Sequence, residues 1–470
     1  MLELIQSGHP LTLRQRLGLT ARLSWPAIMA QLSSILMQYI DAAMVGRLGA
    51  VDSAAVGLVS TSLWLFWGVC SAATVGFSVQ VAHAMGAAEY GRGRDIMRQG
   101  ILASFLFGTL IAAIGVSISQ FLPHWLGGQD EICRPASQYF LVFVSALPLL
   151  SLNYIGCGVL RAAGNMKVPG GLNVMMCVLD VVFNFLLIFP TRQLTLLGTT
   201  FTMPGAGLGV LGAALGTVAA EVVTAASVMW YLLTRQEHLA LTYVKGRLGR
   251  FRFSRAVSLK AVKVAAPLTL EHAVICSAQI MVTVIVAPLG AVAIAANAFA
   301  VTAEALCYMP GYGIGDAATT LVGQSYGAGR RDLARQFGYI TTLSGMVIMS
   351  VMGILLWLFA PSVMSLMSPV RGIIDLGAEV LRIEAWAEPM FAASIVAYGV
   401  MVGVGDTIVP ACMNFGSIWL VRVPLAALLA PSMGLRGVWI AMCIELCFRG
   451  AIFLWRLASG AWLRHGLKSA

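Results

Sequence analysis

The sequence predicts an all-α polytopic membrane protein with 12 transmembrane helices in two six-helix bundles, related by a pseudo-two-fold axis along the membrane normal. Its composition, its apolar segments and an internal repeat support this fold class. Apolar residues fill 59% of the 470 positions, charged residues 11%, and the mean hydropathy is +0.85. A soluble chain carries about 25% charged residues, so most of this chain is expected to lie in hydrocarbon. The nine cysteines contain no CxxC pair, and we expect them to be small apolar fillers.

Twelve apolar segments match the thickness of a bilayer, whose core needs about 20 residues of helix. They cover residues 22–46, 52–82, 97–121, 135–162, 168–190, 207–233, 258–287, 293–323, 337–360, 376–404, 408–430 and 434–462. The predicted domains are an N-terminal segment (1–21), an N-lobe (22–233), a basic linker (234–257), a C-lobe (258–462) and a tail (463–470).

The positive charges predict the orientation. One side of the membrane, which includes both termini and the linker, collects 22 of the 30 Lys and Arg residues. The opposite side holds Arg47, Arg134, Arg192, Arg371, Arg382 and Arg436. Because cytoplasmic loops are enriched in Lys and Arg, we expect the N-terminal segment, linker and tail to be cytoplasmic. The expected location is the inner (cytoplasmic) membrane.

The two halves repeat one another at an offset of 241 residues. Matched pairs include Pro26 and Pro267, Gly86 and Gly327, Pro148 and Pro389, and Asn173 and Asn414. The first half carries 16 additional residues near 190–205, which we expect to form a small external hairpin or cap. Since each half has an even number of spans, both insert with the same orientation, and a substrate site is expected between the lobes near mid-bilayer.

Several motifs, in order along this repeat, resemble the multidrug and toxic compound extrusion (MATE) exporters, in particular the NorM-like and DinF-like bacterial branch. Pro26-x4-Gln31 followed by MQYIDAAMVG at 37–46 is similar to the first helix of that family, and GQSYGAG at 323–329 and GDT at 405–407 continue the similarity. The resemblance covers about residues 22–462. It implies a V-shaped pair of bundles that exports organic, often cationic or amphiphilic compounds in exchange for inward Na⁺ or H⁺.

Buried carboxyl groups are the candidates for coupling to that ion, because an ionised side chain at mid-bilayer costs roughly 2.5–3.5 kcal/mol on insertion scales. The candidates are Asp41, Asp180, Glu271, Glu304 and Glu388. Glu271 is the first of these; the alternative is a protonated acid bonded to a carbonyl freed by Pro267. Glu271 and Glu304 are also possible Na⁺ ligands, since hard cations prefer oxygen. Asp180 shares a helix face with Asn184, which fits either coupling or simple interhelical bonding.

Four further charged residues are expected to form structural ion pairs: Glu384, Arg422, Glu445 and Arg449. Glu384 and Glu388 lie one turn apart on one helix face, so they would share a proton or cation unless one of them pairs with Arg422. Glu445 and Arg449 have the i, i+4 order that favours an intrahelical pair.

The predicted function is secondary active efflux by alternating access. We expect the substrate cavity to be lined by Gln31, Met37, Tyr39, Asn184 and Gln279. The chain has no Walker A motif, no nucleophile–base constellation and no repeated filter-like loop, so an ATP-driven pump, an enzyme and a channel are not expected. A lipid or lipid-linked oligosaccharide flippase is the alternative and would need a more cationic cavity. Expected partners are a small organic substrate and the bilayer; no nucleic acid and no cofactor are expected, and the chain is expected to be a monomer.

Overall fold

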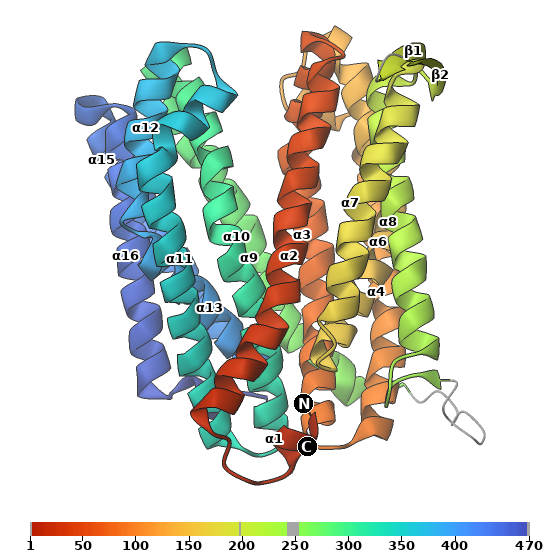
Figure 1. Ribbon diagram of the computed structural model, residues 1–470, viewed down its shortest axis with the longest axis vertical. Coiled ribbons are helices and arrows are strands. Elements are labelled where there is room, and N and C mark those ends of the chain that lie inside the picture. Colours follow the sequence, from red (N-terminus) through yellow and green to blue (C-terminus); the bar gives the residue numbers. More distant parts are fainter. Residues whose placement is uncertain (1, 197–198, 242–252, 468–470) are drawn as a thin grey trace.

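The computed structural model describes residues 2–196, 199–241 and 253–467, which form two helical bundles side by side (Figure 1). The N-lobe consists of α2 (Leu13–Gly46), α3 (Ala50–Gly86), α4 (Tyr90–Ile118), α6 (Asp130–Ala162), α7 (Lys167–Ile188) and α8 (Gly209–Thr234). The C-lobe consists of α9 (Arg255–Val286), α10 (Ala291–Gly327), α11 (Arg331–Met367), α12 (Arg371–Ala385), α13 (Glu388–Val404), α14 (Ile408–Ser417), η3 (Ile418–Arg422), α15 (Val423–Met433) and α16 (Leu435–Ser459). The short helices are α1 (Leu2–Gln6), α5 (Leu122–Trp125), η2 (Ala287–Leu289) and α17 (Trp462–His465).

The predicted twelve spans are confirmed, with two irregular ones in the C-lobe. Among the described residues, 11 helices are long and apolar enough to cross a membrane, and the bent pair α12–α13 makes up to 12. The predicted span 376–404 is therefore not one straight helix: it bends by 59° between Glu384 and Glu388. Pro389, which has no backbone N–H to donate, lies in the first turn after the bend. The predicted span 408–430 is also interrupted, by the π-helical turn η3.

The repeat seen in the sequence is a repeat in structure. Helices α3 and α10 begin 241 residues apart, at Ala50 and Ala291, and also end 241 apart, at Gly86 and Gly327. The residues that precede them, Gly49 and Gly290, both have positive φ (131° and 97°). Only glycine adopts such a backbone readily, which explains why both copies carry it.

The additional residues of the first half form the expected hairpin. Strands β1 (Pro190–Leu196) and β2 (Thr199–Ala206) pair antiparallel between α7 and α8. The hairpin lies at the end of the molecule opposite both termini (Figure 1). We call the end with the termini the closed end and the end with the hairpin the open end. Residues 242–252 of the predicted linker and 468–470 of the predicted tail lie outside the described residues.

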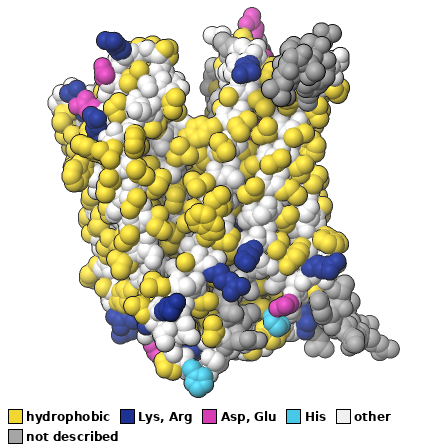
Figure 2. Space-filling view, in the orientation of Figure 1, with side chains coloured by type: hydrophobic (Ala, Val, Ile, Leu, Met, Phe, Trp, Pro, Cys, Tyr) yellow, Lys and Arg dark blue, Asp and Glu magenta, His cyan; other side chains and the backbone are white. Residues whose placement is uncertain are grey.

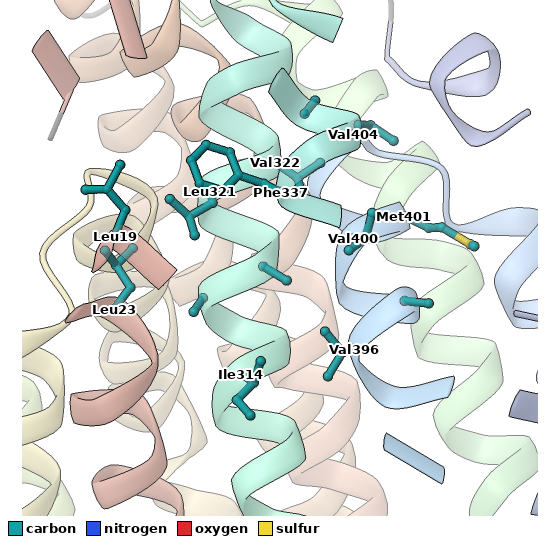
Figure 3. Close-up of a cluster of buried hydrophobic side chains, with 14 of the residues drawn as sticks. Leu19, Leu23, Ile314, Leu321, Val322, Phe337, Val396, Val400, Met401 and Val404 are labelled. Atoms are coloured by element: carbon teal, nitrogen blue, oxygen red, sulfur yellow. The ribbon is translucent and has the colours of Figure 1, made fainter. Parts of the chain in front are cut away.

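The lobes share one hydrophobic core at the closed end, and the surface is hollowed between them at the open end (Figure 2). Figure 3 shows the core, in which Leu19 and Leu23 of α2 pack with Phe337 of α11 and with apolar residues of α10 and α13. The first half of α2 is thus buried against the C-lobe.

The first half of α9 has the equivalent position in the N-lobe. Ala261 belongs to the N-lobe cluster that contains Phe77 and Val228. Pro26 and Pro267 follow these first halves, and beyond Pro26 the helix α2 packs in its own lobe, where Met37 contacts the cluster of Met176 and Ala220. The matched prolines therefore mark where each helix passes from one lobe to the other.

Candidate functional site

The first candidate site is a carboxyl cluster inside the N-lobe. The Nδ2 group of Asn184 in α7 donates to Oδ1 of Asp41 in α2 at 2.8 Å and to Oδ2 of Asp180, one turn earlier, at 3.2 Å. Asp180 and Asn184 are buried, and Asp41 is partly buried. Neither acid forms an ion pair within the described part of the chain. An amide can supply two hydrogens, so one neutral donor holds two carboxyl groups together.

A glycine in the next helix makes this cluster possible. A Cβ on Gly216 of α8 would lie 2.1 Å from Oδ1 of Asn184. The hydroxyl oxygen of Thr217, the next residue, accepts from the Asn184 amide at 3.5 Å. One turn farther along α8, Glu221 is buried and accepts from Asn153 at 3.0 Å. The sequence gives no reason to choose Glu221 as a site residue, because a lone acid in an apolar helix belongs to no motif.

The second candidate is Glu271 in α9, which is buried. Tyr398 of α13 donates its hydroxyl to Oε2 at 2.5 Å, and the side-chain amide of Asn414 in α14 donates to Oε1. Both oxygens therefore accept bonds from side chains, and among the described residues no hydrogen bond joins Glu271 to a carbonyl freed by Pro267.

The contact between Glu271 and Asn414 has a counterpart in the N-lobe. Asn173, the counterpart of Asn414, directs its amide to the carbonyl of Ala30 at 3.5 Å. Ala30 is in turn 241 residues before Glu271. The same asparagine thus reaches the same helix position in both lobes, and only the C-lobe has a carboxyl group there.

A network of ions occupies the interior of the C-lobe. Two nitrogens of Arg422 bind Oε2 of Glu445, at 2.6 and 2.9 Å, and Arg449 lies 3.1 Å from Oε1. Ser417 donates its hydroxyl to the same carboxylate. The predicted pairing of Arg422 with Glu384 or Glu388 is therefore wrong. Arg422 ends the π-helical turn η3, where the additional residue changes side-chain directions from those of a regular helix.

Glu384 and Glu388 lie on either side of the α12–α13 bend, so they do not share the single straight face that their spacing predicts. Both are fully buried, and none of their four oxygens has a hydrogen-bond partner in the described residues. Glu304 of α10, also buried, is close enough to interact electrostatically with both. Burying unpaired carboxylates is costly, and among the described residues no three acidic, cysteine or histidine side chains lie close enough together to hold a metal ion.

Polar contacts also bridge the two lobes. Arg161 of α6 forms an ion pair with Asp316 of α10 at 2.6 Å, and Gln31 of α2 donates to the same oxygen at 3.4 Å. The charge pattern counts Arg161 among the cations of a cytoplasmic connection and so does not predict this ion pair. The one sequence feature that could have indicated it is Asp316, an acid within an apolar segment. Nearer the open end, Tyr39 of α2 donates to the backbone carbonyl of Thr302 in α10.

His272 makes a further bridge between the lobes. Its Nε2 lies 3.1 Å from the carbonyl oxygen of Trp64 in α3. The imidazole occupies the space beside Gly68, where a Cβ would lie only 1.8 Å from the ring.

The residues predicted to line the substrate cavity are therefore divided. Gln31 and Tyr39 connect the lobes, and Gln279 is exposed on α9. Met37 and Asn184 are buried inside the N-lobe and do not face the space between the lobes. Met37 packs against α7 and α8 because α2 rejoins its own lobe after Pro26, whereas Asn184 lies on α7 itself.

Comparison with known proteins gives the family. The model of the MatE family matches residues 26–186 and 267–428, two segments that begin 241 residues apart. "Probable multidrug resistance protein NorM" of Thermotoga maritima is 26% identical over 452 residues, 95% of this chain and 93% of that protein. "Multidrug resistance protein NorM" of Burkholderia vietnamiensis is 27% identical, over 93% of this chain and 92% of that protein.

Solved structures share the fold. One described as "Crystal structure of MATE in complex with MaL6" has a TM-score of 0.88 at 21% identity and covers 98% of this chain and 99% of its own. Another, "Outward-facing conformation of a multidrug resistance MATE family transporter of the MOP superfamily", has a TM-score of 0.87 at 21% identity, over 96% and 97% of the two chains. With more than half of its residues matched by the family model, this chain belongs to the MatE family of membrane transporters, as its sequence motifs predict, and is not an enzyme.

Proposed function

We propose that this protein is a secondary active antiporter that exports amphiphilic, often cationic organic compounds in exchange for Na⁺ or H⁺. The names of its relatives support multidrug efflux. Two lobes that meet at one end and part at the other are suited to alternating access. We place the closed end and both termini on the cytoplasmic side of the inner membrane, in agreement with the positive charge there, and propose a monomer as the working unit.

The observation that carries this proposal is the presence of buried carboxyl groups without basic partners in both lobes. Asp41 and Asp180 share one amide, and Glu384 and Glu388 have no hydrogen-bond partner among the described residues. Such groups change charge when a proton or Na⁺ arrives. A coupling ion can shift the lobes only if it binds one arrangement more tightly than the other, and Asp41 and Glu271 lie on the two helices that pass between the lobes.

The proposed ion ligands are Asp41, Asp180, Glu271, Glu304 and Glu388, with Glu271 and Glu304 supplying oxygens if the ion is Na⁺. For the substrate, we propose contacts with Gln31, Tyr39 and Gln279. A flippase for phosphate-bearing lipids would need unneutralised basic groups between the lobes. Arg161, which reaches that region, is already paired with Asp316, so the described contacts favour antiport.

The experiment is transport of a cationic dye by the purified protein in liposomes with an imposed Na⁺ or pH gradient. We expect dye movement to follow one of the two gradients and to be lost in Asp41→Asn, Glu271→Gln and Glu388→Gln. The matched control is Glu379→Gln, because Glu379 forms a partly exposed pair with Arg436. Dye transport that is independent of both gradients and is unchanged in all three variants would exclude the proposed coupling.

A further inference from the structure

A groove with a volume of about 440 Å³ lies on the C-lobe, between α11, α12 and α16. Helices α12 and α16 are on the side of this lobe that faces away from the N-lobe (Figure 1). The groove is therefore separate from the contacts between the lobes. Its lining combines a cation, a carboxylate, two indole rings, a thiol and branched apolar side chains: Arg382, Glu379, Trp357, Trp386, Cys443, Ile383, Ile440 and Ile444.

The surface around the groove is built to contact lipid. Helix α11 exposes a strip of apolar side chains three or four residues apart, which places them on one face: Leu343, Val347, Val351, Ile354 and Leu358. On α16, Ile444, Phe448 and Trp455 are exposed in the same way. Trp386, at the bend between α12 and α13, is 76% exposed. The flanks of the molecule are mainly hydrophobic (Figure 2), so the groove opens toward the membrane.

Arg382 supplies a positive charge that the described residues do not neutralise. Its Nε donates to the carbonyl of Trp357 at 3.3 Å, and its guanidinium lies 5.4 Å from the centroid of that indole ring. Glu379, three residues earlier, is bound to Arg436 at 2.7 Å. In the described part of the chain, no carboxylate lies within 4.0 Å of Arg382.

The position of Arg382 indicates which anion would meet it. The residue follows Arg371, the first residue of α12, by 11 positions, or about 16 Å along the helix. Arg382 lies next to two tryptophans of the kind that gather at the membrane interface, where the available anion is the phosphate of a lipid. A guanidinium binds phosphate through two parallel hydrogen bonds.

We infer that this groove is a binding site for an anionic phospholipid. The phosphodiester binds the terminal nitrogens of Arg382, Trp357 and Trp386 pack against the glycerol region, and one acyl chain follows Ile383, Ile440 and Ile444. The inference does not depend on the transported substrate or on the coupling ion.

The test is lipid retention by the full chain in detergent, measured by native mass spectrometry with added phosphatidylglycerol. Arg382→Gln removes the cation, and Ile383→Trp fills the groove while leaving the cation in place. We expect Arg382→Gln to weaken retention roughly tenfold, as the loss of one charge-assisted contact would, and Ile383→Trp to weaken it by blocking the groove. Arg371→Gln, which removes a cation from the start of the same helix, should retain lipid like the wild type. Size-exclusion chromatography establishes that each variant is folded.

Four results would overturn the inference. Unchanged lipid retention in folded Arg382→Gln would show that Arg382 does not bind the phosphate. An equal loss in Arg371→Gln would reduce the effect to general surface charge. Displacement of the lipid by millimolar inorganic phosphate, or equal retention of phosphatidylcholine, would show that the groove does not select an anionic lipid.

Discussion

His83 of α3 and Gln324 of α10 occupy equivalent positions of the repeat, and each donates a hydrogen bond to a backbone carbonyl of the opposite lobe. Nε2 of His83 lies 2.8 Å from the oxygen of Gly403, and Nε2 of Gln324 lies 2.7 Å from the oxygen of Ala162. The two acceptors, like the two donors, are 241 residues apart. Since a carbonyl only accepts, the facing nitrogen of His83 carries a proton.

The backbones cross in contact at the same place. A Cβ on Gly86 would lie 1.9 Å from the carbonyl oxygen of Gln324, and one on Gly327 would lie 2.2 Å from that of His83. The two contacts are again related by the repeat. The closed end is therefore held by a symmetric pair of polar contacts next to the shared apolar core.

Breaking these contacts should loosen the closed end. We expect His83→Ala and Gln324→Ala each to cost about 1 kcal/mol of closed-state stability, a shift of roughly fivefold in population. Spin labels at Gly91 and Asp332, which are equivalent exposed positions, would report it as longer distances in a cysteine-free background. Asn165→Ala breaks amide contacts within the N-lobe alone and is the control. Identical distance distributions in the wild type and the three variants would show that His83 and Gln324 do not hold the closed end together.

Gly216 should be as important to the N-lobe site as the acids themselves. In Gly216→Ala, the new methyl would overlap Oδ1 of Asn184, so Asn184 must move away from Asp41 and Asp180. We expect dye transport to fall at least as far as in Asn184→Ala. Gly171→Ala, on α7, meets no atom within 4 Å and should transport normally. Full activity in Gly216→Ala would mean that the amide bridge is dispensable.

The ion network of the C-lobe should be structural. Removing one partner of a buried ion pair typically destabilises by about 3–5 kcal/mol, so we expect Arg422→Gln to lower the unfolding temperature of the purified protein sharply. Arg436→Gln breaks a partly exposed pair and should cost at most about 1 kcal/mol. Equal unfolding temperatures for the two variants would contradict this assignment.

Glu384 and Glu388 should behave in the opposite way. Because no described residue pairs with them, an amide of similar shape removes little that the fold needs. We expect Glu384→Gln/Glu388→Gln to change the unfolding free energy by less than about 1 kcal/mol and to lose gradient-driven transport. A loss of stability as large as that of Arg422→Gln would instead make the two acids part of the structural network.

Much of the fold was predictable from the sequence because the relevant signals are local or repeated. Apolar length predicts each span, and the matched prolines and glycines predict a second copy of the first half. The family model, which matches twice at the same offset, confirms that repeat. The small hairpin was predictable as well, since it fills the one gap in the alignment of the halves.

The site was less predictable because its contacts depend on where helices bend and cross. One alternative, the pairing of Arg422 with Glu384 or Glu388, supposes straight helices, but the π-helical turn and the 59° bend direct these side chains elsewhere. No spacing along α7 reveals that Asp41 on α2 shares the amide of Asn184. Arg161 counts as a loop cation in any charge pattern, although it reaches Asp316 in the other lobe.

The passage of α2 and α9 between the lobes has a consequence for the molecule as a whole. Each lobe completes its core with the first half of a helix that belongs to the other, which is the relationship found in domain-swapped dimers. Neither half of the chain is therefore a closed folding unit. Cutting the connection between the two halves would leave two fragments that stay bound to each other. Separating these fragments would expose Leu19, Leu23 and Ala261, which are buried in the lobe formed by the other half.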